Sequence, residues 1–171
     1  MPSTYSPLKI QLMATGENNT SWGDVTNVNL GTALEEAIAG SADVVFASAD
    51  VTLTLVDTNT TQVARNMRLS LTGTTGGITR NLIVPNIEKM YAIYNITDGQ
   101  IIIKTAAGSG PTIPSQKAMM VAVDGTNVVP PVASHVTRTL HVENSDVPTP
   151  SLPEMTASPL VSAVPGTAPP T

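Results

Sequence analysis

The sequence predicts a mainly β protein: an antiparallel β-sandwich or jelly-roll-like domain with one short N-terminal helix and extended N- and C-terminal arms. From residue 42 onward, apolar and polar residues alternate in short runs, as they do in strands with one buried face. Turn signals separate these runs, and the last stretch is rich in proline. We expect an arm over residues 1–23, a helix plus β-rich domain over residues 24–142, and a proline-rich arm over residues 143–171.

The helix is expected over residues 24–40, after a polar and irregular N-terminal segment. Its apolar residues recur at near-helical spacing and share one face: Leu30, Leu34, Ala37 and Ile38. Thr32 and Glu35 have the spacing of a capping box, and Gly40 suits the position after the C-cap. A helix this short gains its stability by docking, so we expect the apolar face to be buried.

Strands follow wherever the sequence alternates with a period of two. They are expected near residues 43–47, 51–55, 67–71, 81–84, 90–96, 100–105, 118–123, 126–129 and 136–142. Asp98-Gly99 and Asp124-Gly125 each separate two such runs, which predicts two hairpins with type I′ turns. Residues 72–79 and 108–114 are expected to be loops.

Seven prolines occur after Val147, so the C-terminal segment is expected to be extended. It carries apolar residues that could contact a partner: Leu152, Met155, Leu160, Val161 and Val164. We expect this arm to lie along a neighbouring subunit. The alternative is that it folds back on its own domain.

Composition excludes several classes of protein. The net charge of −5 provides no basic surface for nucleic acid, so no nucleic acid is expected as a partner. The absence of cysteine excludes disulfides, zinc knuckles and thiol nucleophiles. No apolar run has the ~18 residues that span a bilayer, and the N-terminus lacks the pattern of a secretory signal. We expect neither a membrane partner nor secretion.

Catalytic, cofactor-binding and metal-binding residues are expected to be absent. The two histidines, His135 and His141, have no carboxylate in their pattern and are expected to be structural. Glu35 and Glu36 are neighbours on a helix, so their carboxylates point in different directions. The glycine-rich run at residues 73–77 lacks the G-K-[ST] ending of a phosphate-binding loop.

Trp22 is the single tryptophan in a chain poor in aromatic residues. It is expected to provide a large share of apolar contact area. We favour the interpretation that it anchors the N-terminal segment to the domain. The other interpretation is that it inserts into an adjacent protein.

The N-terminal region resembles the N-terminal module of tailed-bacteriophage virion proteins of the tail-fibre-like type. The resemblance is carried by a polar turn with a T/S-W-G triplet at residues 20–23, an N-x-N step at residues 27–29 and an L-x-E-A-I helix at residues 34–38. It continues weakly through the alternating strands to about residue 130. It implies a non-enzymatic component of a phage particle, oligomeric and commonly trimeric, assembled in the host cytoplasm.

This sequence departs from long fibres because a proline-rich segment follows the β-rich module in place of a shaft. We therefore expect a virion protein that decorates or cements the head surface, with capsid or tail subunits as partners beside its own homotrimer. One alternative is a tail component, either a fibre-attachment adaptor or a short receptor-binding protein. Another is a carbohydrate-binding module, for which Tyr5, Tyr91 and Tyr94 are the candidate aromatics.

Overall fold

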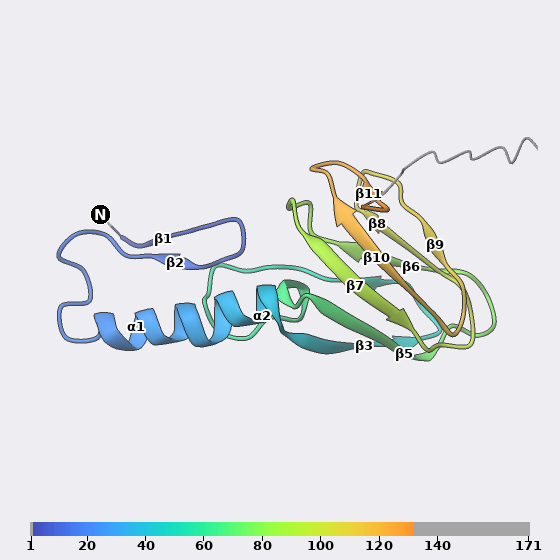
Figure 1. The fold of residues 1–171 in the computed structure, drawn as a ribbon, viewed down its shortest axis with the longest axis horizontal. Helices are drawn as coiled ribbons and strands as arrows, with labels where there is room; N and C mark the ends of the chain where they lie inside the picture. The colour runs from blue at the N-terminus through green and yellow to red at the C-terminus, as the bar shows by residue number, and fades with distance from the viewer. Residues whose placement is uncertain (1, 132–171) are drawn as a thin grey trace, which may run out of the picture. The chain divides into compact units, whose positions relative to one another are not determined.

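The computed structural model describes residues 2–131 of the 171-residue chain. A helical N-terminal part precedes a body made of two β-sheets (Figure 1). Several predictions lie outside the described residues: the strand over residues 136–142, the C-terminal arm over residues 143–171, His135 and His141, and the arm residues Leu152, Met155, Leu160, Val161 and Val164.

The N-terminal segment is more regular than the sequence predicts. Strands β1 (Thr4–Tyr5) and β2 (Gln11–Leu12) pair antiparallel in a small ribbon. The helix follows without interruption as α1 (Trp22–Val28), a π-helical segment η1 (Asn29–Leu34) and α2 (Glu35–Ile38). It therefore begins and ends two residues before the expected range.

The capping-box interpretation of Thr32 and Glu35 is wrong, because both residues lie inside the continuous helix rather than at its start. Gly40 does occupy the position after the C-cap residue Ala39, and its amide donates to the Glu35 carbonyl at 3.1 Å. A Cβ at residue 40 would lie 2.5 Å from the Glu36 Cα, so the close approach of the backbone requires glycine.

Two mixed sheets form the β-rich body. The five-stranded sheet has the order β11-β10-β7-β5-β3, with β3 (Ser41–Ala47), β5 (Arg68–Thr74), β7 (Met90–Asn95), β10 (Lys117–Val123) and β11 (Val128–Val129). The four-stranded sheet has the order β4-β6-β8-β9, with β4 (Val51–Thr52), β6 (Arg80–Val84), β8 (Ile101–Thr105) and β9 (Thr112–Ile113). A 3₁₀ turn, η2 (Val63–Arg65), precedes β5.

From β3 to β8 the chain alternates between the two sheets, one strand at a time. As a result β3, β5 and β7 are parallel neighbours in one sheet, and β4, β6 and β8 are parallel neighbours in the other. Only β9, β10 and β11 pair antiparallel with their neighbours within these sheets. The fold is mainly β as predicted, but the prediction of an antiparallel sandwich or jelly roll is wrong.

The two predicted hairpins have different outcomes. Asp98-Gly99 joins β7 in one sheet to β8 in the other, so it forms no hairpin. Asp124-Gly125 does begin the turn between the antiparallel strands β10 and β11, where the Asp124 carboxylate accepts the amides of Thr126 and Asn127. Only Gly125 has a positive φ, of 93°, whereas a type I′ turn needs two such residues. Strand β9 lies where a loop was expected.

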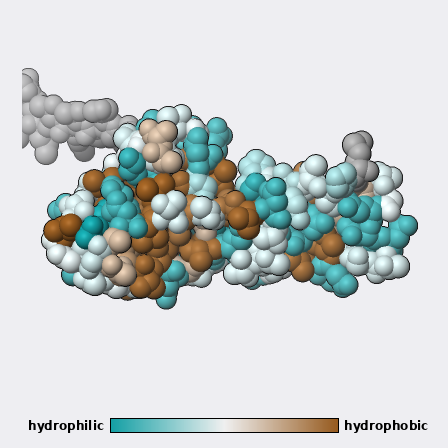
Figure 2. All heavy atoms as spheres, turned by 180° about the vertical axis from the view of Figure 1, so that it is seen from behind, coloured by the Kyte–Doolittle hydropathy of each residue, from teal (hydrophilic) through white to brown (hydrophobic). Residues whose placement is uncertain are grey.

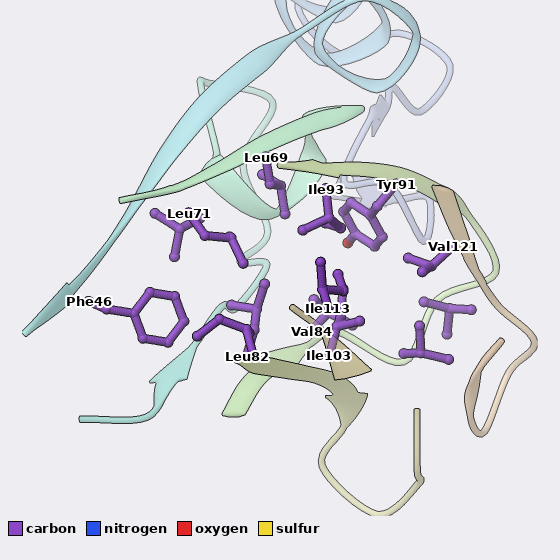
Figure 3. Close-up of a cluster of buried hydrophobic side chains, with 14 residues drawn as sticks. Phe46, Leu69, Leu71, Leu82, Val84, Tyr91, Ile93, Ile103, Ile113 and Val121 are labelled. Carbon is purple, nitrogen blue, oxygen red and sulfur yellow. The ribbon is translucent and has the colours of Figure 1, made fainter. Parts of the chain in front are cut away.

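The two sheets enclose one apolar core (Figure 3). Alternate residues point inward, so each strand of the two sheets except β4 contributes one or two buried side chains: Val44, Phe46, Leu69, Leu71, Leu82, Val84, Tyr91, Ile93, Ile101, Ile103, Ile113, Val121, Val123 and Val128. Aliphatic side chains dominate, which agrees with the small aromatic content of the sequence. Among the described residues, the fully buried members of this core lie within residues 44–128.

Candidate functional site

The helix presents its apolar face to solvent rather than to the protein. Leu30 and Ile38 are 57% and 66% exposed, and Leu34 is also exposed. The side chains that the helix buries are those of Asn29 and Ala33. The expectation that the leucine face is buried is therefore wrong, and we call Leu30, Leu34 and Ile38 the helix stripe.

Part of this stripe lies in the π-helical segment η1, whose turns are wider than those of an α-helix. Asn29 and Ala33 lie on the buried side of this segment, while Leu30 and Leu34 are exposed beside them.

Trp22 begins the helix and is 61% exposed. A tryptophan that anchors the N-terminal segment to the domain would be buried, so the favoured interpretation of Trp22 is wrong. A large apolar side chain is instead left uncovered at the start of the helix. Its neighbour Asp24 in the first turn makes no ion pair with any residue in the described part of the chain.

Buried Arg65 attaches the end of the helix to the β-rich body. Its guanidinium contacts the Glu36 carboxylate at 3.0 Å and donates to the carbonyls of Leu8, Thr58 and Thr60 at 2.8–2.9 Å. Burial lowers the pKa of Arg65, and the Glu36 charge opposes that effect. The donors of this one side chain thus hold the N-terminal segment, the helix and the loop before η2 together.

Lys89 lies beside this cluster and is also largely enclosed. Its ammonium donates to the carbonyls of Arg65 and Asn66 and lies 4.2 Å from the centre of the Tyr91 ring. Burial, together with the charge of Arg65, lowers the pKa of Lys89 to about 8. Burial also raises the pKa of Tyr91, whose hydroxyl donates to the Ala64 carbonyl.

A half-open cavity of about 420 Å³ lies where the parallel strands β4, β6 and β8 end. Its walls come from residues 52–55, 83–86 and 105–107, with Thr126 on one side. The lining is apolar apart from threonine hydroxyls and the Asn86 amide, and it contains no charged residue. Such a cavity suits an uncharged, largely apolar group.

The part of the outer face of the five-stranded sheet that β7 and β10 form is also apolar. Each cross-strand pair of β7 and β10 on this face combines one large side chain with an alanine: Met90 with Ala122, Met120 with Ala92, and Tyr94 with Ala118. The last two of these pairs border a hollow of about 200 Å³. Apolar side chains reach the surface over much of the two-sheet body, as the brown regions in Figure 2 show.

The candidate carbohydrate-binding aromatics do not form one platform. Tyr91 points into the core and is fully buried, while Tyr94 on the opposite face of β7 is stacked under the Arg68 guanidinium at 4.3 Å. Tyr5 belongs to the N-terminal ribbon. Tyr91 and Tyr94 thus face opposite sides of one strand.

No residues in the described range 2–131 form a cluster that could bind a metal through three or more histidine, cysteine or acidic side chains. Glu35 is exposed whereas Glu36 pairs with Arg65, so the two carboxylates diverge as predicted. None of the helices within residues 2–131 has the length and apolar character needed to cross a membrane. The run at residues 73–77 is fastened by the Asp98 carboxylate, which accepts the Thr75 amide and the hydroxyls of Thr74 and Thr75.

Comparisons with models of protein families, with curated proteins and with solved structures return no match. Sequence reasoning missed the Arg65 cluster and the cavity, because both depend on segments that lie far apart along the chain. The periodic spacing of the helix stripe could be recognised in the sequence. Such a pattern does not tell whether the surface that covers the stripe belongs to the same chain or to another one.

Proposed function

We propose that this chain is a non-enzymatic structural protein of a tailed-bacteriophage particle, which associates with copies of itself and decorates or cements the head surface. The observation that carries the proposal is the exposed helix stripe of Leu30, Leu34 and Ile38. The stripe belongs to the same segment whose T/S-W-G, N-x-N and L-x-E-A-I motifs resemble phage virion proteins.

Self-association follows from the cost of leaving such a surface in water. Each apolar side chain covered by a partner contributes about 25 cal/mol for each Å² removed from solvent. Helices with one apolar face associate most simply along that face, and the trimer common among the resembling proteins would cover three stripes at once. Assembly onto capsid subunits would take place in the host cytoplasm.

A tail component, either an adaptor or a short receptor-binding protein, is the alternative within the same class. It would use the same helix stripe for self-association but would occur in few copies at one vertex. Quantitative mass spectrometry of purified particles separates the two roles. Hundreds of copies per particle support decoration, a few copies support the tail, and absence of the chain from particles would reject both.

The role of the helix stripe is tested with a triple variant, Leu30→Ser, Leu34→Ser and Ile38→Ser. We expect loss of the oligomer in analytical ultracentrifugation, with little change in the unfolding of the monomer, because these side chains are exposed. The matched control carries Val45→Ser, Val56→Ser and Ile78→Ser, three apolar residues exposed elsewhere. Equal loss of association in both variants would contradict a specific role for the helix.

A further inference from the structure

We infer that Trp22 of one copy inserts into the cavity at the ends of β4, β6 and β8 of a second copy. This inference rests on the self-association in the proposed function and names a contact that the helix stripe does not explain. Trp22 is separated from Leu30 by eight residues, and the residue midway between them is the polar Thr26. The Trp22 indole lies about 12 Å from Leu30 along the helix axis, so it needs a partner of its own.

The cavity matches an indole in size and polarity. Its volume of about 420 Å³ has room for an aromatic side chain, and no charged residue lines it. A buried indole also needs an acceptor for its N–H group. The Asn86 side chain lines the cavity and makes no hydrogen bond within the described residues, so its amide oxygen can accept that proton.

Charges beside the two surfaces are complementary. Asp24 stands two residues after Trp22, and Lys104 pairs along the sheet with Ile83, which lines the cavity. The ion pairs among the described residues join Lys9 to Asp57 and Arg65 to Glu36, so neither Asp24 nor Lys104 forms an ion pair, although the charge of Lys104 also acts on the Asp50 carboxylate. Insertion of Trp22 would bring an acidic side chain towards a basic one and help to orient the contact.

The contact is heterologous, because a projection on one copy fills a hollow at a different place on the next. Such contacts close into rings or continue as open chains. The occupant is thus a second copy of this chain, in an orientation set by a single side chain.

Tryptophan fluorescence tests the inference directly, since the chain has a single tryptophan. In the full-length protein we expect the emission maximum to shift to shorter wavelength as concentration rises, with loss of quenching by acrylamide. Ala107→Phe, which fills the cavity, should abolish this shift. The matched control Ala47→Phe places the same side chain on an exposed alanine of β3 that does not line the cavity, and it should leave the shift intact. Circular dichroism verifies that each variant is folded.

Mixing two defective variants provides the decisive result. Trp22→Ala copies keep the cavity and emit no tryptophan signal, whereas Ala107→Phe copies keep the indole but not the cavity. We expect the mixture to recover the shift that neither variant shows alone. Two results would overturn the inference and leave self-association intact. In the first, an oligomer forms but Trp22 stays accessible to acrylamide. In the second, the emission shift survives Ala107→Phe and disappears in the helix-stripe variant. A chain that is monomeric at every concentration would overturn both.

Discussion

At the scale of single residues, Arg65 is the side chain on which the attachment of the helix depends. It is fully buried, and its charge is balanced by Glu36 and by the carbonyls around it. Arg65→Ala would leave these acceptors without donors and Glu36 without its partner. We expect a loss of about 3–5 kcal/mol in the free energy of unfolding, measured by urea denaturation.

Arg68→Ala is the matched control for Arg65→Ala. Arg68 is exposed and stacks on Tyr94, a contact worth about 0.5–1 kcal/mol at an exposed site. We expect its removal to cost no more than that. Similar losses in the two variants would show that the Arg65 cluster does not hold the structure together.

Lys89 gives stability an unusual dependence on pH. Its pKa is about 8 in the folded chain, against about 10.4 when unfolded, so between these values the unfolded state binds more protons. The free energy of unfolding should therefore rise with pH across this window, by up to about 3 kcal/mol. Above pH about 10 the trend reverses, because burial raises the pKa of Tyr91 and the unfolded phenol ionises first.

Two lysine variants check the origin of this rise. Lys89→Met removes the buried ammonium and should abolish the increase in denaturation midpoint between pH 8 and pH 10. Lys104→Met changes a lysine on the outer face of β8 and should preserve it. A rise that persists in Lys89→Met would assign the effect to another group.

At the scale of elements, Gly31 within the helix and Gly40 just after it respond differently to an added Cβ atom. A Cβ at Gly31 would meet no atom within 4 Å, whereas a Cβ at Gly40 would collide with Glu36 and Asn66. Gly31→Ala should stabilise the chain by about 0.4–1 kcal/mol, because alanine loses less conformational freedom on folding. Gly40→Ala should destabilise it. Thermal unfolding of the two variants measures both signs, and a gain in both would contradict the close packing at the helix end.

The strands also show what the sequence could and could not predict. Period-two alternation located β5, because Leu69 and Leu71 alternate with polar neighbours. The same alternation fits parallel and antiparallel partners alike, so it could not reveal that β5 pairs with β3 and β7 in parallel. Nor could it predict that Arg65 is buried, since that burial depends on carbonyls 5 to 57 residues away.

At the scale of the whole molecule, the apolar core of the folded body and the exposed apolar side chains proposed to reach other chains are different residues. Core side chains occupy residues 44–128, while the helix stripe and Trp22 precede them. The apolar residues expected to contact a neighbouring subunit follow this core in the sequence. Stability and assembly should therefore respond to different substitutions.

Deletion of residues 148–171 tests this separation. We expect the shortened chain to unfold at the same denaturant midpoint as the full chain, because the core of the described residues lies within residues 44–128. Its occupancy on purified particles should fall, because it lacks the apolar residues of the arm. A full-length variant carrying Leu152→Ser, Met155→Ser and Leu160→Ser distinguishes lost apolar contacts from lost length and should bind as weakly. If the shortened chain saturates particles as the full chain does, the arm has no role in attachment, and the helix with its exposed stripe must provide the assembly contacts by itself.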